Sequence, residues 1–202
     1  MIGSHDTMTY LPTKQWYLKP FKWMAKCQSK PLNEQFEKYD VRLFDFRVKF
    51  KNEEPVFAHG LMQFKGSVTD HLDYLNSAAS TTNTPVYVRI ILESNSEMKN
   101  QDIQELLFIE FCEYITHKYT NLKFFGGRRK YDWKVVYDFG FEPNLTDRYS
   151  STTNIFGGKK THWTAILDDF WPWLYARLNN KKNIKNLDNS DTILFIDFVN
   201  IR

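Results

Sequence analysis

The sequence lacks the features that would assign it at once to several common protein classes. It holds only two cysteines among 202 residues, Cys27 and Cys112, which argues against a disulfide framework, and no close Cys/His cluster suggests zinc. We expect Cys112, on the apolar face of a predicted helix, to be a buried free thiol. No apolar run approaches the ~18–20 residues that span a bilayer, and no signal peptide appears.

The chain also has only a small excess of charge of one sign. The net charge is only +3, which fits an anionic substrate or surface but lacks the concentrated basic stripe of a nucleic-acid-binding protein. We therefore expect no nucleic-acid partner. Repeats and linkers are absent too, so the chain is expected to be a single domain over residues 1–202 and a monomer. The compartment stays open: cytoplasm, export by a non-classical route, or delivery in a particle.

What the sequence does contain is concentrated between Val41 and Gly60. The segment 41–50 alternates as a strand does, with phenylalanines and valine on one face and Asp45 and Arg47 on the other. A short charged turn and a second apolar run follow, and this run stops at His59. An acid, a base and an imidazole at strand ends are typical of a functional site.

The order of the other elements predicts the fold class. Charged residues gather at the carboxyl ends of strands that alternate with helices, apart from one hairpin, which is the pattern of an α/β barrel. Because 202 residues are short for eight units, we expect a compact, irregular TIM barrel with fewer than eight regular β/α units. Strands are predicted as a stub before His5 and at 41–50, 55–59, 86–93, 133–139 and 193–199. Helices are predicted at 67–79, with Ser67 as N-cap, at 100–119, and at 164–178, the last kinked by Pro172. The helix 100–119 is expected to turn Ile103, Leu107, Phe111, Tyr114 and Ile115 toward the core.

Six polar residues at these strand ends make a plausible catalytic set. Two histidines supply a general base and a general acid near neutral pH, carboxylates fix their tautomers, and an arginine grips a phosphate. Such groups suit phosphodiester cleavage without metal. Each residue alone also has a structural interpretation: a strand-end histidine, an inward salt bridge, or a satisfied core carboxylate. The set is His5, Asp6, Asp45, Arg47, His59 and Asp197.

Four segments carry a resemblance to a known family. IGSHDTMTY, DVRLFDFRVKF, VFAHG and ILFIDFVN resemble the catalytic domain of phosphatidylinositol-specific phospholipase C, especially its bacterial form. The resemblance implies that His5 is the general base, partnered by Asp197, and that His59 is the general acid, bonded by Asp6. In this family a neighbouring hydroxyl of the substrate attacks its own phosphate and forms a cyclic phosphodiester.

Arg47 decides the cofactor question within this resemblance. The eukaryotic branch of the family has a carboxylate at this position and binds calcium there. An arginine implies instead a phosphate clamp and no cofactor, because a fixed guanidinium can replace the charge of the ion. Asp45 would orient either this arginine or a histidine. The chain is shorter than the bacterial members, which again implies a trimmed barrel.

The substrate-binding residues match the family less closely. Arg89 and Glu93 lie on the predicted strand 86–93, where the family usually has a basic residue near the end and this chain has Ile91. The segment LTDRY resembles a headgroup-contacting motif, which would make Asp147 and Tyr149 binding residues. Specificity for inositol therefore stays open, and the expected substrate is a phosphoinositide, another phospholipid or a related phosphodiester.

An aromatic and lysine-rich segment at 13–30 allows two interpretations. It could be an amphipathic helix that packs its aromatics inward. Alternatively, Trp16 and Trp23 could touch anionic lipid headgroups, with Trp163 on a second rim loop. KPFKWMAK takes the place of a short lipid-touching helix in the bacterial relatives, which supports the second interpretation.

Two other functions compete with a phospholipase-like enzyme. One is a catalytically weak or inactive module that binds a phosphate or a headgroup within a larger assembly. The other is a glycerophosphodiester phosphodiesterase, but that related barrel prefers a Glu-x-Asp metal pair, which this chain lacks.

Overall fold

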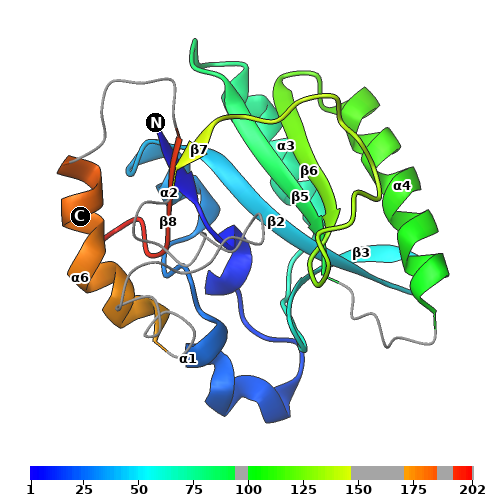
Figure 1. The fold of residues 1–202 in the computed structure, drawn as a ribbon, viewed down its shortest axis with the longest axis horizontal. Helices are drawn as coiled ribbons and strands as arrows, with labels where there is room; N and C mark the ends of the chain where they lie inside the picture. The colour runs from blue at the N-terminus through cyan, green and yellow to red at the C-terminus, as the bar shows by residue number, and fades with distance from the viewer. Residues whose placement is uncertain (94–99, 147–170, 186–192, 202) are drawn as a thin grey trace.

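The computed structural model describes residues 1–93, 100–146, 171–185 and 193–201 (Figure 1). Strands and helices alternate along the chain, so the predicted α/β class is confirmed. The strands are β1 (Ile2–Ser4), β2 (Val41–Lys51), β3 (Glu54–His59), β4 (Met62–Gln63), β5 (Val86–Leu92), β6 (Leu122–Arg129), β7 (Leu145–Thr146) and β8 (Ile193–Ile196). The helices are α1 (Lys22–Ala25), α2 (Leu32–Glu37), α3 (Val68–Ala79), α4 (Gln101–Lys118) and α6 (Pro172–Lys185), with 3-10 turns η1 (Thr7–Tyr10) and η2 (Trp16–Phe21).

The central sheet places the first strand beside the last. Its parallel strands run in the order β6-β5-β2-β1-β8-β7, and β2 continues past this sheet to pair antiparallel with β3. Neighbours in sequence are thus neighbours in space, with β8 returning to β1, as in a barrel. Within the described residues β6 and β7 are not paired, so the sheet is open there. The irregular closed barrel stays a prediction.

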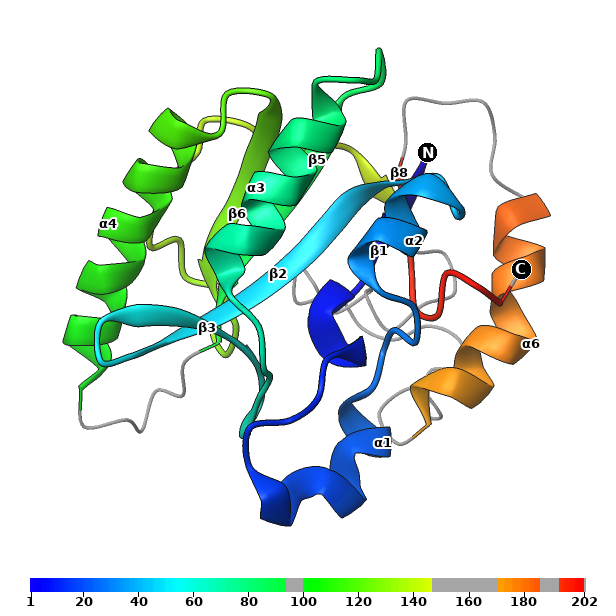
Figure 2. The same ribbon diagram turned by 180° about the vertical axis from the view of Figure 1, so that it is seen from behind.

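Strand β2 has two different faces, as its alternation predicted. Phe44, Phe46 and Val48 are fully buried in the main core. Figure 2 shows α2, α3 and α4 covering this side of the sheet. On the opposite face, Leu43 packs with Phe195 in a second, smaller cluster. Burial of each large apolar side chain contributes about 1.5–3 kcal/mol, so the alternation fixes which face Asp45 and Arg47 share.

Helix α4 buries most of the apolar face that its sequence predicts, including Phe111, Cys112 and Ile115, but two residues differ. Ile103 and Tyr114, expected in the core, are exposed. Gln104 is buried in their place, because its amide donates to the carbonyl oxygen of Phe50 at 2.8 Å and accepts from the Phe50 N–H at 2.9 Å. These bonds pair the backbone N–H and C=O groups of Phe50 near the end of β2, and they attach α4 to that strand. At α3 the expected N-cap is confirmed, since the Ser67 hydroxyl accepts from Asp70 N–H.

The strand predicted at 133–139 is wrong, and β6 precedes it. This segment forms only a single bridge, between Arg128 and Val135, because the Val136 and Tyr137 amides both donate to the carbonyl oxygen of Gly127. Gly126 and Gly127 have positive φ and sit beside a register shift between Ile90 and Ile91. The paired glycines obscured a strand in the sequence while allowing a bulge in the structure.

Gly127→Ala is therefore expected to lower the free energy of unfolding by about 2–4 kcal/mol. A Cβ at this position would lie 1.8 Å from the carbonyl oxygen of Tyr137, and the backbone φ is +61°. Gly140→Ala is the matched control, since its φ is +68° but nothing lies within 4 Å of a Cβ there. Denaturant unfolding of both variants gives the comparison, and equal losses would contradict the packing argument.

The carboxyl-terminal part also differs from expectation. Pro172 is the first residue of α6 rather than a kink inside a helix, because proline lacks an amide hydrogen and fits the first turn. The helix continues to Lys185, beyond residue 178, where the predicted helix ended. Its Asn180 side chain donates to the carbonyl oxygen of Asp197 at 2.7 Å, which connects α6 to the end of β8.

Candidate active site

The structure brings the six predicted catalytic side chains together at the carboxyl ends of the strands. His5 and Asp6 directly follow β1, Asp45 and Arg47 lie on the inner face of β2, and the others end β3 and follow β8. Parallel pairing of β1 with β2 and β8 aligns five of these residues at one edge of the sheet, and the antiparallel return of β3 along β2 brings His59 back to them. All six are buried except His59, whose side chain is 22 % exposed.

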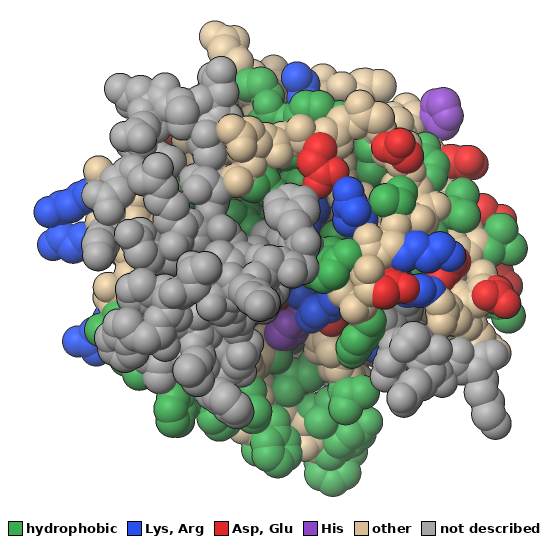
Figure 3. All heavy atoms as spheres, viewed as in Figure 1, with side chains coloured by type: hydrophobic (Ala, Val, Ile, Leu, Met, Phe, Trp, Pro, Cys, Tyr) green, Lys and Arg blue, Asp and Glu red, His purple; other side chains and the backbone are tan. Residues whose placement is uncertain are grey.

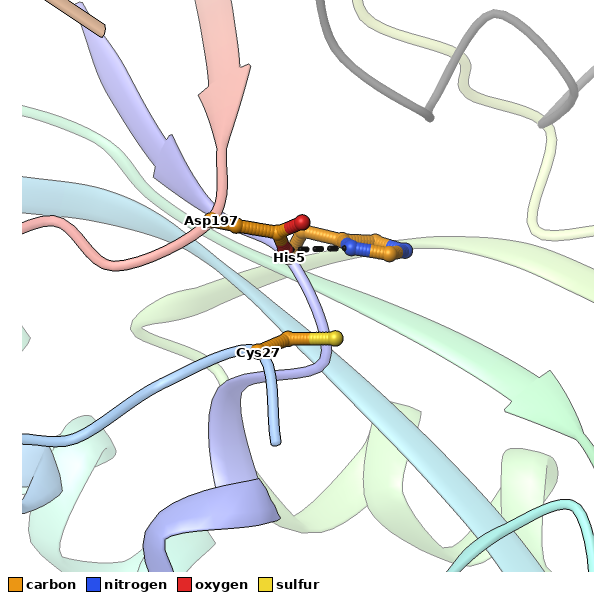
Figure 4. A group of neighbouring side chains, drawn as sticks. All are labelled: His5, Cys27 and Asp197. Atoms are coloured by element: carbon orange, nitrogen blue, oxygen red, sulfur yellow. Dashed lines mark hydrogen bonds and ion pairs between the residues drawn. The ribbon is translucent and has the colours of Figure 1, made fainter. Parts of the chain in front are cut away.

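His5 is held by a partner on each ring nitrogen. Its Nδ1 lies 2.7 Å from Asp197 Oδ1 (Figure 4), and its Nε2 lies 2.6 Å from the Arg47 guanidinium. A carboxylate only accepts and a guanidinium only donates, so the ring proton belongs on Nδ1 and the lone pair on Nε2. Burial, aided by Arg47 and opposed by Asp6, lowers the pKa of His5 to about 3. The imidazole is therefore neutral near pH 7.

Asp6 connects the two histidines to the arginine. One carboxylate oxygen forms an ion pair with Arg47 Nε, and the other lies 3.3 Å from His59 Nε2 and 3.5 Å from His5 Nε2. Burial alone would raise the pKa of Asp6, but Arg47 and the two histidines hold it below its ordinary value. The residue has φ 42° and ψ 51°, a left-handed conformation that is costly outside glycine and clusters at functional sites. Its amide is fixed by Asp45 Oδ2 at 3.1 Å.

Arg47 is the buried cation at the centre of the site. Its Nε lies 3.2 Å from Asp45 Oδ2, and its Nη1 lies 3.9 Å from Glu93 Oε2. Burial alone would lower the pKa of Arg47, but these carboxylates and Asp6 raise it above its ordinary value. The guanidinium thus remains charged at every accessible pH, and Asp45 orients it rather than a histidine.

Glu93 joins the site through a lysine that the sequence analysis did not single out. Its Oε1 accepts from Lys130 Nζ at 2.8 Å and from the Gly60 amide at 2.6 Å. Burial alone would raise the pKa of Glu93, but Lys130 and Arg47 lower it. Lys130 directly follows β6, so it could have been identified by the same strand-end rule had that strand been recognised. With its side chain 25 % exposed, its ammonium can reach an anionic or hydroxylated ligand.

Arg89 lies deeper than the other polar residues of the site. Its Nε is 3.1 Å from Asp45 Oδ1, and its guanidinium faces the rings of Phe195 and Trp133 at 5.3 and 5.7 Å. Burial lowers the pKa of Arg89. Its assignment to substrate binding stays a prediction, since almost none of its surface is exposed. Asp147, Tyr149 and Trp163 lie outside the described residues.

The aromatic segment before α2 faces outward. Trp16 is 77 % exposed, and Tyr17, Phe21 and Trp23 are exposed as well, so the inward-packed helix is wrong. The reason is that η2 and α1 are short and leave no continuous face for the core. Trp23 stacks on Trp171 with ring centroids 6.4 Å apart. In Figure 3 hydrophobic side chains gather at the lower edge of the molecule, where Figure 1 places α1.

The lowered pKa of His5 predicts acid-sensitive folding. Because the folded pKa of about 3 lies below the ordinary 6.5, the unfolded chain binds this proton first as the pH falls. The stability is fully present above pH 6.5 and is lost progressively toward pH 3. Burial also lowers the pKa of His59, against the opposing charge of Asp6. Protonation of His59 therefore also destabilises the folded protein as the pH falls.

His5→Asn should therefore flatten the dependence of the unfolding free energy on pH in this window. Urea unfolding at several pH values measures the slope. The control is His117→Asn on the exposed end of α4. A slope that His5→Asn leaves unchanged would argue against a neutral buried imidazole.

Comparisons with known proteins show likeness in structure only. No family model and no curated protein matches the sequence. Phosphatidylinositol-specific phospholipase C from Listeria monocytogenes aligns over 98% of this chain and 87% of its own, with a TM-score of 0.60 and 18% identity. A variant of the Staphylococcus aureus enzyme aligns over 98% of this chain and 84% of its own, with a TM-score of 0.59 and 15% identity. This chain therefore has the fold of the bacterial phosphatidylinositol-specific phospholipases C.

Proposed function

We propose that this protein is a metal-independent phosphodiesterase of the phospholipase C type, acting on a phospholipid headgroup or a related phosphodiester. The observation that supports it best is the position of His5, whose neutral ring lies between a carboxylate on Nδ1 and a phosphate-binding cation on Nε2. The fold shared with bacterial phospholipases C agrees with it.

His5 is the general base in this proposal. Its Nε2 lone pair takes the proton of a substrate hydroxyl next to the phosphate, and Asp197 stabilises the imidazolium that forms. In the free protein Arg47 occupies this lone pair. A bound phosphate competes for the guanidinium, which releases Nε2 for the proton transfer. The attack of the substrate's own hydroxyl then gives a cyclic phosphodiester.

Arg47, Asp6 and His59 complete the reaction. The guanidinium grips the phosphate and stabilises the charge that develops on it. His59 protonates the leaving oxygen, with Asp6 holding one ring nitrogen at 3.3 Å. Its Nδ1 is buried and has no hydrogen-bond partner among the described residues. To act as the acid, the ring must carry a second proton, a state that burial opposes and the charge of Asp6 favours. Lys130 and Glu93 border the same space and are candidates for headgroup contact.

The carboxylates of this site do not suit a calcium ion. Hard cations need several oxygen ligands around an open position. Here Arg47 Nε pairs with both Asp6 and Asp45, so an ion between these carboxylates would have to displace the guanidinium. We therefore propose that no metal cofactor takes part.

The exposed aromatic segment fits a lipid surface. Trp16, Trp23 and Trp171 present apolar rings, and exposed Lys14 and Lys19 lie in the same stretch of chain. Aromatic and basic side chains together bind the headgroup region of anionic membranes. No helix in the described part of the chain is long and apolar enough to cross a bilayer. We propose that this segment makes peripheral contact with a membrane surface. We also propose that the fold is a barrel with fewer than eight regular β/α units.

The decisive experiment offers the protein a set of phospholipids and soluble phosphodiesters with and without EDTA, with products followed by phosphorus NMR. We expect a cyclic phosphate that forms equally in both conditions. Activity that EDTA abolishes and calcium restores would contradict the arginine-based mechanism. Binding of phosphate without turnover of any phosphodiester would favour the headgroup-binding module.

Replacing Trp16 and Trp23 together by alanine is expected to weaken binding to anionic vesicles by about tenfold or more, because two apolar contacts with the lipid are lost. Vesicle sedimentation measures the change. Tyr114→Ala, which removes an exposed ring from α4, is the control. Activity on a soluble phosphodiester should stay unchanged in the double variant, and equal vesicle binding by all three proteins would refute a role for this segment.

A further inference from the structure

Cys27 lies beside the His5–Asp197 pair. Its Sγ is 3.6 Å from Asp6 Oδ2, and one ligand atom from each of His5, Cys27 and Asp197 lies within 4.8 Å of the others. Figure 4 shows the thiol beneath the imidazole and the carboxylate, each from a different part of the chain. The cluster is not visible in the sequence, because these residues are remote along the chain.

A shared set of buried hydrogen bonds holds the three side chains in place. The Cys27 carbonyl oxygen accepts from Phe198 N–H at 2.7 Å, which links its segment to the residue after Asp197. The side-chain amide of Gln28 donates from Nε2 to the carbonyl oxygens of His5 and Ile196, at 3.1 and 3.0 Å. Thr9 accepts from the backbone amides of both Cys27 and Gln28. The backbone under all three ligands is therefore preorganised.

We propose that His5, Cys27 and Asp197 form a site for a soft divalent cation such as Zn²⁺, and that a bound ion takes His5 out of acid–base chemistry. A thiolate, an imidazole and a carboxylate are the ligands that Zn²⁺ takes, and thiolate selects against calcium and magnesium. The inhibitory part of this proposal rests on the proposed function, whereas ion binding does not.

The charge around the site favours a cation. With neutral histidines, four buried carboxylates face three basic side chains, which leaves one net negative charge. The Arg47 guanidinium contacts His5 at Nε2, whereas Asp197 contacts it at Nδ1. The groups counted are Asp6, Asp45, Glu93 and Asp197 against Arg47, Arg89 and Lys130.

Binding is a ligand exchange without oxidation or reduction. The Cys27 thiol releases its proton to solvent and binds as thiolate. If His5 binds through Nδ1, its ring proton moves to Nε2, where it would oppose the Arg47 donor now 2.6 Å away. The ion thus replaces the hydrogen between His5 and Asp197 and removes the lone pair needed for the base.

The test uses Co²⁺ as a spectroscopic probe and Zn²⁺ as competitor on the full chain. We expect one equivalent of Co²⁺ to give a thiolate-to-metal charge-transfer band that Zn²⁺ abolishes. Cys27→Ser and His5→Gln should each weaken Zn²⁺ binding by at least about tenfold, equivalent to ~1.4 kcal/mol. Cys112→Ala removes the other buried thiol and should leave binding unchanged. Circular dichroism confirms that each variant is folded.

Activity measured alongside separates the two proposals. With a phosphodiester that the protein cleaves, Zn²⁺ should inhibit the wild type at concentrations at least about tenfold below those needed for Cys27→Ser, each compared with its own metal-free rate. No charge-transfer band, or a band that Cys27→Ser retains, overturns the metal site whatever the activity. Occupancy of the site without inhibition overturns the inhibitory role. Absence of any phosphodiester cleavage overturns the proposed function, while the band and the His5→Gln affinity still decide the site.

Discussion

His5→Ala is expected to lower the turnover of a phosphodiester substrate by about 10²–10⁴-fold, the usual contribution of a general base. The loss follows from geometry: His5 Nε2 is the imidazole lone pair that faces Arg47, and Asp197 fixes it at 2.7 Å. Turnover should fall more than substrate affinity, because the base acts in the transition state and Arg47 remains to bind phosphate. Phosphorus NMR of substrate and product gives the rates.

Two variants control this result. His117→Ala removes an exposed histidine from the end of α4 and should retain full activity. Asp197→Asn keeps the shape of the partner but favours the wrong tautomer, so it should lose much of the rate while the protein remains folded. If His5→Ala retained wild-type turnover, His5 would not be the base and its burial would have only a structural role.

Arg47→Ala is expected to have the second large effect, on both stability and activity. Removing one member of a buried ion-pair network leaves uncompensated charges and costs about 3–5 kcal/mol. Asp6 and Asp45 would lose their shared counter-ion. The pKa of Asp6, which Arg47 holds below its ordinary value, should rise, so the loss of stability should shrink at low pH. Phosphate binding should weaken at the same time, because the bidentate donor is gone.

Arg47→Lys separates charge from geometry. It keeps a cation between the carboxylates but lacks the forked donors, so most of the stability should return while activity stays far below wild type. Arg42→Ala, on the same strand and paired to Asp40 at 2.6 Å, is the matched control for loss of an arginine. Thermal unfolding and initial rates measure the two properties. Full activity in Arg47→Lys would show that a point charge suffices and that bidentate binding is not needed.

Much of the site could be predicted because short stretches of neighbouring residues determine where its side chains lie. The alternation across β2 places Asp45 and Arg47 on one face, and a run that stops at a turn puts His59 at the end of β3. Side chains alternate with a period of two, so a few neighbouring residues determine which ones share a face. The same rule places His5 at the end of a short first strand. Asp197 was predicted inside the strand 193–199, whereas β8 ends at Ile196 and Asp197 follows it.

The failures have a common physical origin. The glycine pair of β6 weakens the strand pattern, yet the structure needs it for the bulge, so Lys130 was missed with its strand. The aromatic residues of η2 and α1 allowed a core helix as one of two interpretations, because whether a ring is buried depends on what packs against it. The burial of Gln104 on α4 could not be predicted either, because it depends on bonds to the backbone of β2.

The sequence by itself determined the two faces of β2, the class of the fold and the types of residue at the strand ends. Only the tertiary structure decided which of these residues touch. Asp197 is 192 positions from His5 yet lies 2.7 Å away, and Cys27 reaches the same pair through Gln28 and the end of β8. Periodicity is a property of neighbouring residues, whereas these contacts depend on strand register and on the packing of segments that the chain keeps far apart.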